Sequence, residues 1–506
     1  MFADQIKTKS SLPHSLYRAQ QIKDFEGEAA IAAGTSLYGL MSRTGQACFD
    51  VLKTHFPDPQ NLLVLVGKGN NGGDGYVVAA IAKDAGLNVQ LCQLGDSENL
   101  TGDAAQARNA WRVEQGVIEG IEDANFDRAD VIVDALLGTG LSGTVHPDFQ
   151  RLIFKINQAN KPVLSVDLPS GMNADTGAVH DVAVKADATI SFVGLKQGLF
   201  TGCAAEYCGQ VYFSGLGISD QFRALTKSNI KRVNYEDFTQ LSDKRSRISH
   251  KGFFGKSLVI GGNKGMPGAV RLSAEAALRT GSGLVKVVTR PEHLLAVISG
   301  RPELMVHGYE LETNLDTDIN SLDLGWPTSL LIGPGLGRDK WAINLLESVL
   351  KSELPTIVDA DALNLLVDHP TWKENWILTP HPGEAANLLG CSIAKIEEDR
   401  FSAVRNLQRS FGGIVILKGA GSLICDGKQI YVANVGNPGM ASGGMGDVLS
   451  GIIIGLLAQG LNLLPAATLA VCIHGQAGDL AAQQDERGLL ASDLFPYIRK
   501  LVNPSC

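Results

Sequence analysis

The sequence predicts an α/β protein with two domains, and three observations carry this prediction. The chain has 506 residues, which is more than one hydrophobic core usually supports. Short apolar runs alternate with helical patterns in both halves, which indicates parallel sheets covered by helices on both faces. Hydrophobic residues make up 44% and charged residues 19%, and the 57 glycines cluster in short loops between apolar runs without a collagen-like period. These values are typical of a well-packed globular enzyme and argue against disorder.

The first half contains apolar runs of strand length. Residues 14–56 have a helical pattern, and Tyr76–Asp84 is expected to form a further helix. The runs that we expect to form the sheet are Leu62–Val66, Val89–Leu94, Val131–Asp134, Val163–Asp167, Thr189–Val193 and Val211–Phe213. The helical patterns that separate the first runs from one another favour βαβ units.

The segment Ser219–Ser257 is polar and basic, and we interpret it as a linker. The boundary is expected near residues 225–245, and we assign residues 1–225 and 226–506 to the two domains. The second half then resumes the α/β pattern, with an Ala-rich helix at Gly268–Thr280 and two buried helices within Val448–His474. Its expected strands are Ser257–Gly261, Leu284–Thr289, Leu330–Gly333, Thr356–Asp359, Ile377–Thr379, Ile414–Lys418, and a hairpin of Leu423–Cys425 and Ile430–Val432 around Asp426-Gly427. We find no convincing repeat between the halves.

Charge and composition exclude several classes of function. The net charge of -9 argues against nucleic-acid binding, because phosphate backbones require a basic surface. The stretch Met1–Ser10 has no apolar core of a signal peptide, and no run is apolar enough to span a membrane. The eight cysteines form no CxxC pair and are expected to be reduced thiols. We therefore expect a cytoplasmic enzyme.

A glycine-rich loop, Gly67–Gly75, stands between the strand Leu62–Val66 and the helix expected at Tyr76–Asp84. Glycine lets a backbone approach a pyrophosphate closely, and the helix start supplies N–H donors. The spacing G-x-G-x-x-G is matched, but alone it is a weak signal, and a plain tight turn is the alternative. The Asn and Asp side chains in this loop add oxygens suited to a monovalent cation or to ribose hydroxyls.

Three more loops follow strand ends in the first half: Asp134–Thr144, Asp167–Gly171 and Phe192–Gly198. Ligands of open parallel sheets bind outside the carboxyl ends of the strands, so these loops are expected to meet Gly67–Gly75 at one crevice. A single Asp at a strand end, such as Asp134, is often only a cap or turn residue. Four coincident loops favour a shared site over four separate caps.

A second glycine cluster, within Asn434–Asp447, precedes an apolar helical run from Val448. Such a cluster places free backbone N–H groups and the positive end of a helix at one point, where phosphate binds. Asp447 is expected in the first turn, where a carboxylate can take a proton from a hydroxyl. The loop Lys418–Ser422 follows a buried strand, so its N–H groups can hold nucleotide phosphates. There is no Walker A motif, which excludes a P-loop ATPase.

The loops Asn70–Gly75, Asp134–Gly140 and Asp167–Gly171 together resemble the NAD(P)H-hydrate epimerase (YjeF N-terminal) family, over residues of about 15–220. The resemblance implies a Rossmann-like fold that interconverts the R and S epimers of hydrated NADH or NADPH with a bound potassium ion. It implies Asn71, Asp134 and Ser170 as the ligands of this ion, and oxygen ligands suit a hard cation. It implies proton transfer by Asp167, with Lys196 as a possible partner or a structural residue. The implied substrate-binding residues are Asn70, Asn71, Gly72, Gly73, Asp74, Gly138, Thr139, Gly140, Leu141, Ser142, Gly143, Thr144 and Asp167.

Gly443–Asp447 resembles the Gly-Gly-x-Gly-Asp motif of ribokinase-like enzymes, and residues of about 235–502 resemble the ADP- or ATP-dependent NAD(P)H-hydrate dehydratase family. Six motifs stand in the family's order: Gly261–Ala269, Gly333–Gly337, Val358–Leu363, Thr379–Ala386, Lys418–Ser422 and Gly443–Asp447. The resemblance implies a ribokinase-like fold and binding of magnesium with ADP or ATP. It implies that Lys418, Gly419, Ala420, Gly421, Ser422 and Gly446 bind the nucleotide, and that Ala269, Gly335, His381 and Asp447 bind the hydrated dinucleotide, with Asp447 as the catalytic base.

Two features of this half leave alternatives open. Asp359 and Asp361 could hold magnesium through water, but Asp361 could equally cap a helix. His381 could contact the substrate or lie on the surface, and the intact flanking motif favours the ligand role.

The two-domain order resembles the bifunctional hydrate repair enzymes, which act on small molecules, and we expect a homo-oligomer. One alternative is a ribokinase-like vitamin kinase fused to a nucleotide-binding module. It shares Gly443–Asp447 but does not predict Thr379–Ala386 together with Asn70–Gly75 in one chain. A second alternative is a non-enzymatic binding module in the first half. The presence of Asp167 and of the expected potassium ligands argues against it.

Overall fold

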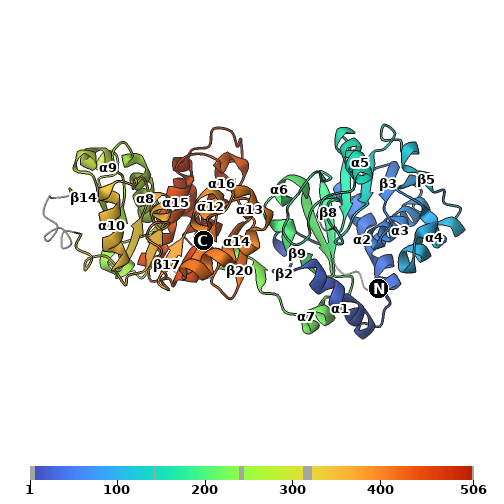
Figure 1. The fold of residues 1–506 in the computed structure, drawn as a ribbon, viewed down its shortest axis with the longest axis horizontal. Helices are drawn as coiled ribbons and strands as arrows, with labels where there is room; N and C mark the ends of the chain where they lie inside the picture. Colours follow the sequence, from blue (N-terminus) through green and yellow to red (C-terminus); the bar gives the residue numbers. More distant parts are fainter. Residues whose placement is uncertain (1–5, 142, 239–243, 311–321, 504–506) are drawn as a thin grey trace. The chain divides into compact units, whose positions relative to one another are not determined.

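The computed structural model describes residues 6–141, 143–238, 244–310 and 322–503. The chain forms two compact units, Met1–Arg232 and Val233–Cys506, coloured from blue to green and from yellow-green to red in Figure 1. Ser142, which the sequence assigned to the first site, lies outside the described residues, as does Cys506. The cysteines within the described residues are all free thiols.

The first unit is built on an eight-stranded sheet with the order β1-β10-β8-β7-β6-β3-β4-β5. Its strands are parallel except β1, which runs antiparallel to β10. The chain order reverses between β3 and β6, which is the switch point where ligands of doubly wound sheets bind. The strands are β1 (Lys7–Thr8), β3 (Asn61–Val66), β4 (Asn88–Gln93), β5 (Glu119–Gly120), β6 (Val131–Ala135), β7 (Val163–Val166), β8 (Ala188–Phe192) and β10 (Gln210–Ser214).

Helices cover both faces of this sheet because both faces are apolar. Leu62 and Val64 point into one buried cluster, whereas Leu63 and Leu65 point into another, as the period of two in a strand requires. The helices of the unit are α1 (Ala19–Ala32), α2 (Leu37–His55), α3 (Asn70–Asp84), α4 (Gly102–Val113), α5 (Pro147–Gln158), α6 (Ala204–Tyr207) and α7 (Ser219–Leu225). The expected α/β class with a parallel sheet is confirmed.

Three expectations for the first unit were wrong in detail. The helical stretch expected at residues 14–56 begins with a strand, β2 (Ser15–Tyr17), which pairs with β9 (Leu195–Lys196) and β11 (Ile230–Arg232). The presumed linker therefore contains the helix α7 and the strand β11. Helix α3 begins at Asn70, before the expected Tyr76, because its glycines let the first turn lie against the sheet. A β-carbon at Gly75 would be 2.6 Å from Cγ1 of Val66.

The second unit contains strands in the order β14-β13-β12-β15-β16-β17-β18-β19-β20. Strands β14 to β18 are parallel, and β19 runs antiparallel to both of its neighbours, β18 and β20. The chain order reverses between β12 and β15, so this sheet has its own switch point. The strands are β12 (Lys256–Ile260), β13 (Leu284–Thr289), β14 (Met305–Gly308), β15 (Ser329–Ile332), β16 (Thr356–Val358), β17 (Trp376–Leu378), β18 (Ile414–Leu417), β19 (Ser422–Cys425) and β20 (Ile430–Ala433).

Apolar helices pack on this second sheet. Alternate strand residues such as Val259 and Leu331 join α8, α15 and α16 in one buried cluster. The two buried helices expected within Val448–His474 are confirmed as α15 and α16, and the Asp426-Gly427 hairpin is confirmed between β19 and β20. The helices are α8 (Pro267–Thr280), α9 (Leu294–Ile298), α10 (Lys340–Leu350), α11 (Asp361–Leu365), α12 (Pro382–Leu389), α13 (Ile393–Glu398), α14 (Arg400–Phe411), α15 (Met445–Ala458), α16 (Leu463–Ala481) and α17 (Phe495–Leu501). No helix in the described ranges is long and apolar enough to cross a membrane.

Candidate active sites

Asp134 is a fully buried carboxylate at the carboxyl end of β6. Its Oδ1 accepts a hydrogen bond of 2.6 Å from the Ser170 hydroxyl, and its Oδ2 accepts one of 2.9 Å from the Ser170 backbone N–H and one of 2.9 Å from Ser165. Burial raises the pKa of Asp134 above its usual value, although these hydrogen bonds oppose the rise. The hydrogen-bond partners of this carboxylate within the described residues are neutral groups, so none of them balances a negative charge on Asp134.

Asn71, in the first turn of α3, contributes a further side-chain oxygen near Asp134 and Ser170. Its Nδ2 donates to the Leu137 carbonyl at 3.2 Å, and the Leu137 N–H donates to the Ser170 hydroxyl at 2.8 Å. Oδ1 of Asn71 is buried and has no hydrogen-bond partner within the described residues. A buried acceptor of this kind is costly unless a cation or water satisfies it. The three residues that the sequence assigned to potassium are thus brought together by the fold.

Asp167 and Lys196 form an ion pair at the same edge of the sheet. Lys196 Nζ donates to Asp167 Oδ1 and, at 3.2 Å, to the Phe192 carbonyl, and the Ser191 hydroxyl donates to Asp167 Oδ1 at 3.3 Å. Lys196 is buried, whereas the Asp167 side chain is 16% exposed. Asp167 also has a φ of 70°, which is strained for a residue with a side chain. The pair therefore presents a partly accessible carboxylate held by a buried ammonium.

Two further carboxylates surround this pair. Burial and the charges of Asp167 and Glu26 raise the pKa of Asp74 well above its usual value. Burial raises the pKa of Glu26, and Lys196 opposes that rise. Glu26 lies on α1 and was missed from the sequence, because no strand end or glycine loop precedes it.

The remaining expected substrate residues of the first unit lie on two neighbouring segments. Asn70, Gly72 and Gly73 are in the first turn of α3, and the loop after β6 contains Gly138, Thr139, Gly140, Leu141, Gly143 and Thr144. A β-carbon on Gly138 would be 3.2 Å from Cβ of Asn71, so the two segments touch. Thr139, Gly140, Gly143 and Thr144 are exposed.

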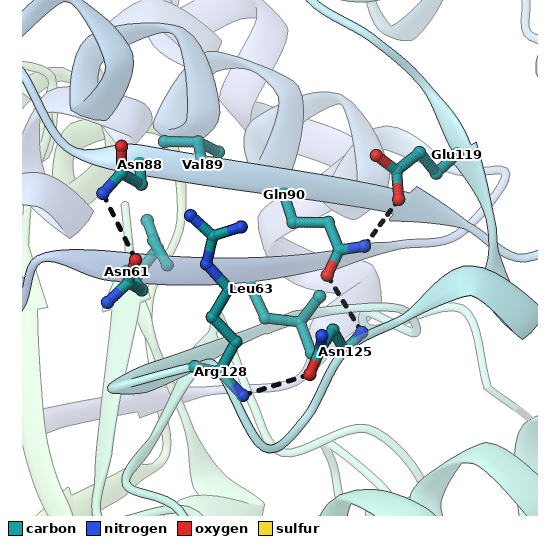
Figure 2. Close-up of a pocket in the computed structure, with 10 residues that line it drawn as sticks. Asn61, Leu63, Asn88, Val89, Gln90, Glu119, Asn125 and Arg128 are labelled. Atoms are coloured by element: carbon teal, nitrogen blue, oxygen red, sulfur yellow. Dashed lines mark hydrogen bonds between the residues drawn. The ribbon is translucent and has the colours of Figure 1, made fainter.

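A separate cavity of about 320 Å³ lies near the amino ends of β3 and β4, away from these loops (Figure 2). Its polar side chains bind one another: Asn88 donates to Asn61 at 3.3 Å, and Gln90 donates to Glu119 at 2.5 Å. Because chemistry in parallel sheets is built at the carboxyl ends of strands, this cavity is not part of the candidate site.

The second site is built on the first turn of α15. Gly444 is the N-cap residue and has a φ of 91°, a conformation that favours glycine. The N–H groups of the turn that follows have no acceptor within the helix. Asp447 lies in this turn. Burial, and next the charge of Asp359, raise its pKa to about 7, and Lys418 opposes the rise. A carboxylate with this pKa is suited to general-base catalysis near neutral pH.

Lys418, at the end of β18, directs its ammonium group into this site. Its Nζ lies 3.1 Å from Asp359 Oδ1 and 3.7 Å from Glu384 Oε2, and a β-carbon at Gly446 would be 3.3 Å from the same Nζ. The charges of Asp359 and Glu384 raise the pKa of Lys418 although burial lowers it. The ammonium therefore stays charged next to the N-terminus of α15.

Asp359 is fully satisfied by other protein groups. Thr379 donates to its Oδ1 at 2.7 Å, Lys418 donates to the same oxygen, and Ser450 on α15 donates to Oδ2 at 2.9 Å. Asp361 accepts a hydrogen bond of 2.9 Å from the Gly337 N–H. Both oxygens of Asp359 therefore accept from protein donors, and one oxygen of Asp361 does, which is compatible with contact to magnesium through water.

The loop Lys418–Ser422 rests on a buried arginine that the sequence did not reveal. Arg400, at the start of α14, donates to the Lys418 carbonyl at 3.0 Å and pairs with Glu397 at 2.8 Å. The Ser422 hydroxyl closes the loop by donating to the Gly419 carbonyl at 3.1 Å. Arg400 is distant in sequence from the glycine motif, so only the fold brings its positive charge beneath the loop that includes Gly419, Ala420 and Gly421.

His381 is the N-cap of α12. Its Nδ1 accepts hydrogen bonds from the Gly383 N–H at 2.9 Å and the Glu384 N–H at 3.2 Å, so the imidazole proton is assigned to Nε2. Burial and the charge of Lys418 lower the pKa of His381. Burial raises the pKa of Glu384 to about 6. The Nε2 of the half-exposed ring lies 3.5 Å from Glu384 Oε1, while the other nitrogen has the structural role of a cap.

The last two expected substrate residues flank the switch point of the second unit. Gly335 follows β15 and Ala269 lies in α8; a β-carbon at Gly335 would be 3.2 Å from Cβ of Ala269. Asn263 joins the two loops by donating to the Leu336 carbonyl at 2.9 Å. The loops after β12 and β15 are therefore in contact, as the strand order requires.

Comparison with known proteins assigns the chain to a family. The sequence model of NAD(P)H-hydrate dehydratases matches residues 257–500, and that of YjeF-related protein N-termini matches residues 37–198. The bifunctional NAD(P)H-hydrate repair enzyme Nnr of Coxiella burnetii is 48% identical over 97% of this chain and 99% of its own. The corresponding Escherichia coli protein is 44% identical over 98% of this chain and 96% of its own. The chain belongs to the bifunctional NAD(P)H-hydrate repair enzymes.

The family's two domains correspond to an epimerase and a dehydratase activity. Among solved structures, a ribokinase-like superfamily protein from Enterococcus faecalis aligns with a TM-score of 0.50 at 28% identity, covering 55% of this chain and 99% of its own. The expected ribokinase-like fold is confirmed. The alternative of a vitamin kinase with an added nucleotide-binding module does not agree with a full-length match to the repair enzymes.

Proposed function

We propose that this chain repairs hydrated NADH and NADPH at two sites, with epimerisation in the first unit and nucleotide-dependent dehydration in the second. The observation that carries the proposal is the Asp447 carboxylate in the first turn of α15, beside the charged Lys418 and Gly446. The direct test adds purified protein to the S epimer of hydrated NADH with ADP or ATP and follows the absorbance of NADH. NADH that appears only with nucleotide supports the proposal, and a phosphorylated product that persists instead would support a kinase.

In the first unit, Asp167 is the group that exchanges a proton at the hydrated carbon. Its ion pair with Lys196 holds the partly exposed side chain in place at the edge of the sheet. Two segments then bind the dinucleotide, and its pyrophosphate lies at the start of α3. They are the turn Asn70–Asp74 and the loop Gly138–Thr144.

Potassium fits the oxygens of Asn71, Asp134 and Ser170. Within the described chain, the buried Oδ1 of Asn71 lacks a partner and the hydrogen-bond donors to Asp134 are neutral groups. One carboxylate with neutral oxygens suits a monovalent ion, because divalent ions usually take more carboxylates or nitrogen and sulfur ligands. The ion would compensate the Asp134 charge and fix the loops after β6 and β7.

In the second unit, Asp447 takes the proton of the substrate hydroxyl, whose oxygen attacks the terminal phosphorus of ADP or ATP. The nucleotide leaves with one phosphate fewer, and the C–O bond of the new phosphate ester then breaks with its electron pair on the departing phosphate. The adjacent ring carbon loses a proton, and the double bond of the nicotinamide ring returns. The N–H groups at the start of α15 and the Lys418 ammonium stabilise the negative charge on the transferred phosphoryl group, and each such donor is typically worth about 3–4 kcal/mol.

Other groups position the reactants in this step. The loop Lys418–Ser422 and Gly446 bind the nucleotide, and Ala269, Gly335 and the Nε2–H of His381 contact the dinucleotide. Magnesium is expected to arrive with the nucleotide phosphates, and Asp359 and Asp361, whose charges act on Asp447, are the carboxylates that could hold it through water. The homo-oligomer and the cytoplasmic location stay predictions from the sequence.

A further inference from the structure

The segment Asn434–Asp447, which opens α15, rests on one face of α16. Four residues of that face contact it: His474, Gly475, Gly478 and Asp479, which are spaced so that they lie on one side of the helix. None of the four lies in a glycine-rich or nucleotide motif of the sequence. Helix α16 therefore contacts the segment through residues that belong to none of these motifs.

Asp479 makes the polar contacts of this face. Its Oδ2 accepts a hydrogen bond of 3.0 Å from the Gly436 N–H, and its Oδ1 accepts one of 3.0 Å from Nδ2 of Asn437. Oδ1 of Asn437 in turn accepts from the Gly439 N–H at 3.0 Å. One carboxylate thus fixes three residues of the segment, two directly and one through Asn437.

Close packing fixes the segment between these hydrogen bonds. A β-carbon at Gly475 would overlap the side chain of Val435, and one at Gly478 would overlap the sulfur of Met440. The backbone of α16 therefore approaches the segment more closely than any other residue type would allow.

The far end of the segment is held as well. His474 is hydrogen-bonded to the backbone of Met445, the first residue of α15, and burial lowers its pKa to about 4, so the ring is neutral. On the other side, the Ser442 hydroxyl donates to the Leu489 carbonyl at 3.0 Å. The segment is thus anchored from Gly436 to Met445.

We propose that Asp479 is a positioning residue for the nucleotide-dependent step, acting with Asn437 to set the segment that aims the α15 N–H groups and Asp447 at the terminal phosphate. This inference rests on the dehydratase function proposed above. Asp479 acts through Gly436 and Asn437 and not by touching the reactants. Loss of its contacts lets the segment shift, and a shift of about 1 Å at reacting groups can cost about 100-fold in rate.

The test exchanges the two partners. Asp479→Asn places one amide NH₂ against another, and Asn437→Asp places two carboxylates together, so each single variant breaks the pair. The double variant Asp479→Asn/Asn437→Asp restores it with donor and acceptor reversed, and the Gly436 and Gly439 N–H groups keep acceptors. We expect kcat for dehydration to fall about 10- to 100-fold in each single variant. The nucleotide KM should stay within about threefold, since Lys418–Ser422 is untouched, and the double variant should recover most of kcat.

Asp426→Asn is the matched control, because it makes the same change in the same unit at a hairpin turn where Asp426 accepts from the Lys428 and Gln429 N–H groups. Hydrogen exchange of the nucleotide-free proteins provides a readout that does not depend on activity. Faster exchange across residues 434–445 in Asp479→Asn, slowed again in the double variant, supports the proposal.

Three results overturn it: single variants within about twofold of wild-type kcat, an equal loss in Asp426→Asn, or a double variant no better than the singles. If wild-type protein itself lacks nucleotide-dependent dehydration, the proposed function fails, while the exchange measurement still decides whether Asp479 fixes the segment.

Discussion

Lys418 Nζ lies 3.1 Å from Asp359 Oδ1, and the same ammonium stands next to Gly446 at the start of α15. The carboxylate keeps the lysine charged and is itself held by Thr379 and Ser450. This arrangement directs a positive charge to the point where a terminal phosphate would meet the free N–H groups of the helix.

Lys418→Met should therefore lower kcat for dehydration about 10²–10³-fold, the usual cost of removing one donor to a developing negative charge. The epimerase activity of the same protein should not change, because Lys418 belongs to the second unit. Steady-state assays of both reactions measure this. In Lys418→Met the carboxylate of Asp359 loses its ion-pair partner, which could disturb the fold. The companion variant Lys418→Met/Asp359→Asn removes both charges and so controls for this defect. Dehydration near the wild-type rate in either variant would contradict the role of Lys418.

Asp447→Asn should abolish nucleotide-dependent dehydration and leave epimerisation intact. A general base typically contributes about 10²–10⁴-fold, so the expected loss lies in this range. Assays with resolved R and S epimers separate the two activities. Dehydration retained within about tenfold would remove Asp447 as the base.

The raised pKa of Asp447, about 7, also sets the pH dependence of dehydration. A base acts in its deprotonated form, and a pKa above the usual value means that protonation begins at higher pH. The kcat/KM should therefore fall about tenfold per pH unit below pH 7 and level off above it. A profile of kcat/KM between pH 5 and about 9, measured at constant ionic strength, tests this direction of change. A flat profile down to about pH 5 would show that the carboxylate is not the base.

Asp167→Asn should stop consumption of the R epimer while dehydration of the S epimer continues. The substitution keeps an acceptor for Lys196 and Ser191 but removes the base. Circular dichroism and thermal unfolding control for the fold. A parallel loss of both activities in a folded variant would show that the division into two sites is wrong.

Rubidium, a heavier alkali ion, should give anomalous density between Asn71, Asp134 and Ser170 in soaked crystals. These residues come from three strand-end segments, and each offers an oxygen. Density at Asp359 and Asp361 alone, or no density, would contradict the assignment and weaken the epimerase interpretation of the first unit.

The strands and the loops that follow them were predictable because their information is local. Runs such as Leu62–Val66 are apolar on both faces, and the polar residues after each strand mark the sheet edge where ligands bind. The first turn of α15 and the place of Asp447 in it were foreseen for the same reason.

Other features depend on contacts between distant residues and could not be predicted. Arg400 beneath Lys418 and Glu26 near Asp167 carry no local pattern, and each matters only through the fold. Asp361 left two interpretations open: its carboxylate accepts from the distant Gly337 N–H and does not cap α11, whereas its contact with magnesium stays a prediction. The early start of α3 at Asn70 was missed because glycine disfavours helices locally, whereas packing on the sheet favours it here.

The most direct test of the two-site account is complementation between Asp167→Asn and Asp447→Asn. Pure R epimer of hydrated NADH is supplied with ADP or ATP, and the absorbance of NADH is followed for each variant alone and for their mixture. The account predicts that neither variant alone converts the R epimer above the uncatalysed rate, and that the mixture converts it to completion, because each protein supplies the site that the other lacks. Conversion by either single variant faster than the uncatalysed rate, or no faster conversion by the mixture of folded proteins, would contradict it.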